Sequence, residues 1–134
     1  KPSIGNLLLW KLIYETEDEF YIDAIRLGWN PKVFKGESID KINTQTAFPW
    51  LVLKSQQAID IERFRWFSNG YIAINPKNKN QILDIRYSAI PNQIGGLWGI
   101  ELSEEKPNNH HVRYITNRTI SSDRLKIIKE MLFY

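Results

Sequence analysis

Two stretches near the start of the chain, residues 7–14 and 20–27, have apolar patterns that are typical of strands. In the first stretch every even position is apolar, whereas Lys11 interrupts the odd positions. Because side chains of a strand point alternately to its two faces, this pattern predicts a strand whose even-numbered face is buried. The second stretch is rich in aromatic and β-branched residues and stops at Gly28. We expect the two strands to pair as an antiparallel hairpin.

The pattern is lost between residues 30 and 50, where Pro31, Gly36 and Pro49 are breakers. This region is predicted to be an irregular connection with room for a short helix or strand. Regularity returns at residues 56–67, which follow the N-cap residue Ser55 and precede an Asn-Gly pair of the kind that ends helices.

Apolar side chains of the predicted helix 56–67 project to more than one side when they are placed at 100° per residue. The residues concerned are Ile59, Ile61, Phe64, Trp66 and Phe67. We therefore expect a central helix that is buried on several sides. Its charged residues stand three positions apart, and the expected neutralising pairs are Asp60 with Arg63 and Glu62 with Arg65.

Two further hairpins are predicted, the first from residues 71–75 and 82–87 and the second from residues 97–102 and 111–116. Polar loops with turn-forming residues separate the two strands of each hairpin. A final amphipathic helix is predicted after Ser121 or Ser122. Its apolar stripe, which should dock on the sheet, consists of Leu125, Ile128, Met131 and Leu132.

Together these elements predict one domain over residues 1–134 with an α+β fold. Its antiparallel sheet should hold about six strands in three hairpins, because no strand–helix–strand alternation requires a parallel crossover. The central helix and the C-terminal amphipathic helix complete the expected architecture.

Composition narrows the function classes. The chain is 43% hydrophobic, 13% aromatic and 25% charged, and it contains no cysteine, which excludes disulfides and thiolate metal ligands. Its net charge is +3, but basic and acidic residues are interspersed, which argues against a nucleic-acid partner. No apolar run reaches the roughly 18–20 residues that cross a bilayer. A soluble globular domain is expected.

Catalytic and metal motifs are absent from the sequence. We find no Gly-rich phosphate loop, no G-x-S-x-G elbow and no H-E-x-x-H pair, so no catalytic residue is assigned. His110 and His111 are adjacent, and in a strand they would point to opposite faces, so they cannot chelate one ion together. No metal ligand is assigned within this chain.

Weak candidates for ligand binding remain on the central helix and the 82–87 strand. Asp84 and Arg86 share one strand face, and with Arg63 they form either an internal ion-pair network or an anion clamp. The internal network is the favoured interpretation. Trp66 and Tyr87 belong to a set of aromatic residues that either stack on a ligand or fill the core, and core packing is favoured.

Four blocks of the sequence carry a resemblance to a known family. They are Asn6 to Lys11, Asp60 to Tyr71, Asp84 to Tyr87 and Leu97 to Ile100. In their order and spacing they resemble the soluble C-terminal region of the predicted membrane-bound metal-dependent hydrolases, multi-spanning inner-membrane proteins of bacteria and archaea. The similarity extends from Asn6 to about Thr116. The family's metal-binding histidine and aspartate motifs lie in an N-terminal membrane region that this chain lacks.

The resemblance implies an accessory domain that positions a substrate or partner beside a membrane-embedded site. The parent protein would lie in the inner membrane, reach the bilayer through its N-terminal region and bind a divalent metal there. The alternative is an autonomous binding module for an anionic ligand or nucleic acid. An independent soluble hydrolase is the least favoured hypothesis.

Overall fold

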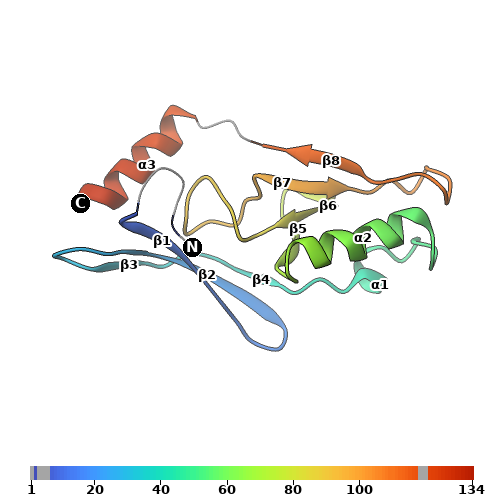
Figure 1. The fold of residues 1–134 in the computed structure, drawn as a ribbon, viewed down its shortest axis with the longest axis horizontal. Coiled ribbons are helices and arrows are strands. Elements are labelled where there is room, and N and C mark those ends of the chain that lie inside the picture. Colours follow the sequence, from blue (N-terminus) through green and yellow to red (C-terminus); the bar gives the residue numbers. More distant parts are fainter. Residues whose placement is uncertain (1, 3–6, 118–120) are drawn as a thin grey trace.

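The computed structural model describes residues 2, 7–117 and 121–134. Within them the chain forms eight strands and three helices (Figure 1). The strands are β1 (Leu9–Glu15), β2 (Glu19–Arg26), β3 (Lys32–Phe34), β4 (Ser38–Asp40), β5 (Ile72–Asn75), β6 (Asn78–Asp84), β7 (Trp98–Glu101) and β8 (Arg113–Thr116). The helices are α1 (Thr44–Ala47), α2 (Gln56–Phe67) and α3 (Ser122–Phe133).

The strands form two antiparallel sheets. In the first sheet β2 pairs with β1 along its length and with the short strands β3 and β4 at its two ends. The second sheet is a meander in the order β5-β6-β7-β8. The predicted antiparallel α+β class is confirmed. The three predicted strand pairs form, but β6 covers Asn78–Asp84 in place of the predicted residues 82–87.

The expectation of one sheet with about six strands is wrong. Pairing of β6 with β7 joins the second and third hairpins into one four-stranded sheet, whereas the first hairpin belongs to another sheet. The additional strands β3 and β4 come from the region predicted to be irregular. They are only three residues each, too short to show an alternating pattern.

The buried face of β1 is the opposite of the predicted one. Leu9 and Lys11 are buried, whereas Leu8 and Leu12 on the even face are 52% and 37% exposed. The lysine tolerates the interior because its Nζ donates hydrogen bonds to Ser88 Oγ at 2.7 Å and to the carbonyl of Gln93 at 3.1 Å. Because its amine is hydrogen-bonded, Lys11 lies on the buried face of β1, and the face that looks uniformly apolar in the sequence is the more exposed one.

Helix α2 begins and ends as predicted. The Ser55 hydroxyl accepts a hydrogen bond from the amide of Ala58, and Asn69 and Gly70 adopt positive φ angles of 54° and 81°. Only one side of the helix is buried, however, so the prediction of burial on several sides is wrong. Its buried residues are Gln57, Asp60, Ile61 and Phe64, and its exposed apolar residues are Ile59, Trp66 and Phe67.

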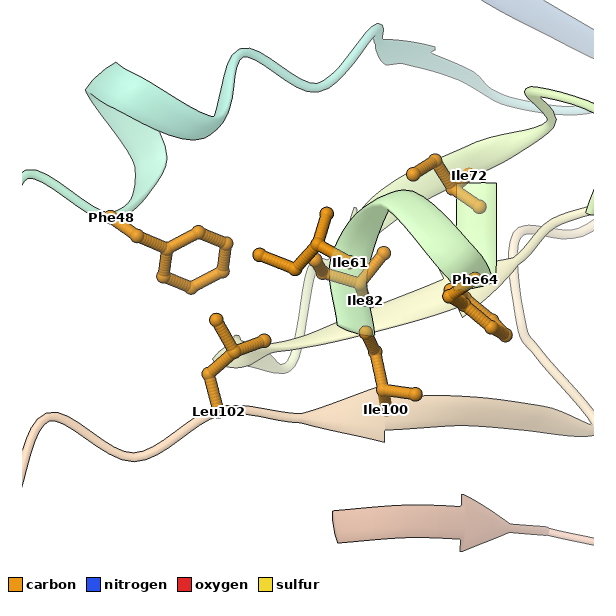
Figure 2. Packing of buried hydrophobic residues seen from close by; sticks show 7 residues of the cluster. All are labelled: Phe48, Ile61, Phe64, Ile72, Ile82, Ile100 and Leu102. Atoms are coloured by element: carbon orange, nitrogen blue, oxygen red, sulfur yellow. The ribbon is translucent and has the colours of Figure 1, made fainter. Parts of the chain in front are cut away.

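The main core lies between α2 and one face of the second sheet (Figure 2). Ile61 and Phe64 of the helix meet isoleucines from three strands, because strand pairing places Ile82 opposite Ile100 and Ile74, and Ile72 shares the face of Ile74. Figure 2 shows the full buried set, which is Phe48, Ile61, Phe64, Ile72, Ile82, Ile100 and Leu102. One face of the second sheet is therefore covered by a helix.

The first sheet contacts the rest of the molecule through the face that carries Leu9 and Lys11 of β1 and Phe20 and Ile22 of β2. Phe20 and Ile22 of β2 pack against Ala73 of β5 and against Ile85, which follows β6. This packing holds the two sheets together. Helix α3 covers another part of the same face, at the end of the molecule away from α2 (Figure 1). Its residue Met131 is buried there.

The predicted cap and docking of α3 are confirmed. The Ser121 hydroxyl accepts a hydrogen bond from the amide of Arg124. At the other end Arg26 of β2 donates to the carbonyls of Met131 and Leu132, which satisfies acceptors that a helix end leaves open. Leu125, predicted to belong to the docked stripe, is instead exposed.

The molecule contains helices of at most 12 residues among the described positions. In that part of the chain, no helix combines the length and apolar character needed to cross a bilayer.

Burial of Lys11 should make stability depend on pH. Burial lowers the pKa of its amine from 10.5 to about 8, although the Glu37 and Asp84 carboxylates oppose this shift. Below pH 8 the folded state carries a desolvated charge, and this cost disappears as pH rises toward the pKa of the unfolded chain. The free energy of unfolding should therefore rise between about pH 8 and 10.5, by about 2–3 kcal/mol relative to Lys11→Met.

Denaturant unfolding across this pH range measures the difference between the two proteins. Lys126→Met, which removes an exposed lysine of α3, serves as the control and should follow the parent protein. Parallel curves for the parent and Lys11→Met would show that the amine keeps its ordinary pKa.

Candidate functional site

A cleft of about 650 Å³ lies on the face of the second sheet that α2 does not cover. Strand alternation sends Asn75, Gln81 and Leu83 to this face, opposite the isoleucines of the core. Ala73 packs against the first sheet, but the part of the face farther along the strands stays open. The floor of the cleft is therefore a sheet surface with polar side chains.

The segment between β6 and β7, residues 88–97, forms one wall of the cleft. It approaches the sheet closely at Gly96, where an added Cβ would lie 2.9 Å from the Cβ of Leu83 and 2.8 Å from the carbonyl oxygen of Trp98. A side chain at this position would push the wall away. The Glu37 carboxylate fixes the same segment by accepting the amide of Ile94 at 2.6 Å.

Four polar side chains, one from each strand, are linked across the second sheet. Asn75 donates to Gln81 at 2.8 Å, and Gln81 donates to Glu101 at 2.7 Å. Arg113 completes the row by donating to the other Glu101 oxygen at 2.6 Å. Strand pairing places Gln81, Glu101 and Arg113 directly opposite one another. We call Asn75, Gln81, Glu101 and Arg113 the polar row.

The polar row holds Glu101 ionised. The hydrogen bond from Gln81 and the charge and hydrogen bond of Arg113 keep the pKa of Glu101 below its usual value, against the opposing effect of burial. Amide orientation is also fixed, because each carbonyl oxygen and amino group in the row has a designated partner. The floor of the cleft therefore presents a preorganised set of polar groups.

Positive charge predominates around the cleft. The charged residues in its lining are Lys77 of the β5–β6 turn, Arg113 of β8, Arg124 of α3 and the single acid Glu37. Glu101 partly neutralises Arg113, and one Glu37 oxygen already accepts an amide. Three cations from three separate elements thus surround one concavity.

Three of the five residues predicted to bind ligand come together elsewhere, in the interior. Asp84 is fully buried, and its carboxylate accepts hydrogen bonds from Arg86 Nη2 at 2.7 Å and from the Trp98 indole at 3.1 Å. Arg86 also donates to the carbonyl of Phe67 at the end of α2. Tyr87 lies against the ring of Trp98, with centroids 4.9 Å apart.

This interior arrangement, which we call the Asp84 cluster, consists of Asp84, Arg86, Tyr87 and Trp98. The hydrogen bonds that the Arg86 guanidinium donates to the Asp84 carboxylate raise the pKa of Arg86, while burial opposes the shift. The predicted Asp84–Arg86 ion pair is therefore present and joins the second sheet to α2.

The other two predicted residues, Arg63 and Trp66, do not belong to the Asp84 cluster. Both lie on the outer side of α2 and line an apolar groove there. Arg63 forms no hydrogen bond or ion pair with any residue that the structure describes, so its expected pairing with Asp60 is wrong. The expected pair of Glu62 with Arg65 is confirmed.

Asp60 instead connects α2 to the loop residues that immediately precede β8. Its carboxylate accepts hydrogen bonds from Gln56, from the amide of Val112 and from His111 Nδ1 at 2.8 Å. Burial acts to raise the pKa of Asp60, but these three donors outweigh it and keep the pKa low. His111 is thus a structural partner of Asp60. Across residues 2, 7–117 and 121–134, no group of three or more metal-binding side chains is assembled.

No protein-family profile, curated protein or solved structure matches this chain.

The polar row and the cleft were not predicted from the sequence. Gln81, Glu101 and Arg113 are polar positions in otherwise apolar strands, which is the signal that could have identified them. They meet only because β6 pairs with β7, and the sequence pattern predicted two separate hairpins at this point.

Removing the Asp84 carboxylate should strongly destabilise the fold. Asp84→Ala leaves the half-buried Arg86 guanidinium and the Trp98 indole without their acceptor, and it removes a carboxylate that stabilises the charged amine of Lys11. We expect a loss of about 3–5 kcal/mol in the free energy of unfolding, the usual cost of breaking a buried ion pair.

Chemical denaturation measures this loss, and Glu62→Ala provides the matched control. That substitution breaks the exposed Glu62–Arg65 pair and should cost about 0.5 kcal/mol or less. Similar losses for the two variants would mean that the Asp84 cluster contributes no more than a surface ion pair.

Proposed function

We propose that this domain is a binding module for a small anionic molecule, which it holds in the cleft on the second sheet. The observation that supports the proposal is the convergence of Lys77, Arg113 and Arg124 on one concavity of about 650 Å³ that contains a single acid. Such a volume lies in the usual range for small-molecule sites. Guanidinium groups bind phosphate and carboxylate groups through two parallel hydrogen bonds.

The polar row prepares this site for its ligand. Arg113 is held at one end of the row by Glu101, so its side chain loses less freedom when a ligand binds. Asn75 and Gln81 offer amide groups on the floor beside it. A ligand that carries an anionic group together with hydroxyl or carbonyl groups matches this lining.

Titration of the isotope-labelled protein with inorganic phosphate, pyrophosphate and citrate tests the proposal. At least one of these probes should shift the backbone amide signals of Gly95 and Gly96 in the cleft wall. Arg113→Gln and Arg124→Gln should each weaken that binding about tenfold, because a hydrogen bond to a charged group contributes roughly 1.5–3 kcal/mol.

Lys126→Gln is the matched control, since it removes one positive charge from α3 outside the cleft lining. It should leave binding unchanged. No response of the Gly95 and Gly96 signals to any probe, or equal weakening by all three variants, would overturn the cleft as the binding site.

A second proposal concerns the parent protein. It is that the chain is an accessory domain of a membrane-bound metal-dependent hydrolase, whose divalent metal and catalytic residues lie outside this chain. What supports it is that the four sequence blocks carrying the resemblance meet in space. Arg86 donates to the Phe67 carbonyl and to Asp84, Asp84 also accepts the Trp98 indole, and the Asp84 charge acts on the buried amine of Lys11.

The genomic sequence that precedes the codon for Lys1 tests this second proposal. Several apolar spans of transmembrane length, with histidine and aspartate motifs among them, are the expected result. A soluble domain in that position would remove the hydrolase hypothesis while leaving the anion-binding proposal intact.

A further inference from the structure

A second concavity, the apolar groove of about 800 Å³, lies on the outer side of α2, away from the cleft. The loop before the helix forms one wall, and the helix forms the other. We call this surface the α2 groove. Its large apolar members are Leu51, Leu53, Ile59, Ile61, Trp66 and Phe67.

Several of these apolar side chains project into solvent. Leu53 is 79% exposed and Trp66 is 85% exposed, although each is large enough to stabilise a core if it were buried. Ile59 and Phe67 on the same helix are exposed as well. Contiguous apolar surface of this kind marks an interaction site in soluble domains.

The charged residues of the groove indicate the sign of the charge that its partner carries. Lys54 and Arg63 line it, and neither forms a hydrogen bond or ion pair with a residue in the described part of the chain. Glu62 is the only acid in the lining, and Arg65 already neutralises it. The groove therefore presents two uncompensated cations beside its apolar residues.

Protruding side chains with flanking cations match a lipid surface better than a protein surface. A protein partner would need hollows that fit Leu53 and Trp66, whereas the fluid interface of a bilayer accommodates projecting groups. Tryptophan is enriched at that interface, and lysine and arginine side chains reach anionic headgroups from it.

From the exposed apolar residues and the two uncompensated cations we infer that the α2 groove docks the domain on an anionic membrane surface. Trp66 and Leu53 insert at the level of the headgroups. Lys54 and Arg63 contact the negative lipids. This contact belongs to the domain itself and does not depend on any membrane-spanning segment or on the anion site in the cleft.

Co-sedimentation with lipid vesicles tests the inference with the chain as it is. Vesicles of phosphatidylcholine mixed with phosphatidylglycerol should bind the protein, vesicles of phosphatidylcholine alone should bind it weakly, and added salt should reduce binding. Trp66→Ser should lower the partition coefficient about tenfold, as expected for one large apolar side chain. Arg63→Glu should lower it at least about fivefold, the factor expected for one basic residue near such a surface.

Two matched variants control for general effects. Trp29→Ser removes a tryptophan that is fully exposed at the other sheet, and Lys79→Glu reverses a charge outside the groove lining. Both should bind vesicles as the parent protein does. Arg113→Gln should also leave vesicle binding unchanged, which separates the groove from the cleft.

Three results would overturn the inference. They are no binding of the parent protein to anionic vesicles, equal binding by Trp66→Ser and the parent, and loss of binding in the Trp29→Ser control. Light scattering adds a further outcome: self-association that Trp66→Ser abolishes, without vesicle binding, would assign the groove to a second copy of the chain.

Discussion

The buried carboxylate of Asp84 is the group on which the arrangement of the other elements depends. It lies at the end of β6 with no exposure to solvent, so each of its lone pairs requires a donor. The donors come from different parts of the chain, namely Arg86 beyond the strand and the Trp98 indole on β7. Arg86 in turn holds the last turn of α2 through the carbonyl of Phe67. One anion thus fixes a helix end and two neighbouring strands.

The same anion influences the first sheet. Lys11 is buried on β1 and bound to Ser88 and Gln93, and the Asp84 and Glu37 charges partly offset its desolvation. A buried amine at this place ties the first sheet to the segment that follows β6. That segment is also the wall of the cleft. The geometry of the proposed binding site therefore depends on interior electrostatics as well as on the strands beneath it.

The elements that the sequence predicted correctly are those fixed by interactions between residues close together along the chain. Local signals were sufficient for α2 and α3, because a serine cap and an Asn-Gly end act within a few residues. The face of β1 was predicted wrongly, since Lys11 is solvated by groups about eighty positions away. The polar row was missed for the same reason: its residues become neighbours only after a long connection lets β6 and β7 pair.

The outer side of α2 shows a different limit of prediction from the sequence. Trp66 and Phe67 were expected in the core because large apolar residues are usually buried, but a helix that contacts one sheet can bury only one side. They are exposed because no further layer of the described chain covers the outer side of the helix. The second sheet has this helix on one face and an open cleft on the other. Burial patterns within a single helix could not reveal how many layers surround it.

Each sheet is formed by a continuous part of the chain, the first by residues 9–40 and the second by residues 72–116. During synthesis all residues of the first sheet are made long before the residues that cover its apolar face. Phe20 and Ile22 must wait for Ala73 and Ile85 to leave the ribosome, and at roughly 5–20 residues per second this takes several seconds. For that interval the apolar residues of the first sheet lack their cover, and exposed apolar segments of this kind make incompletely folded chains prone to aggregation.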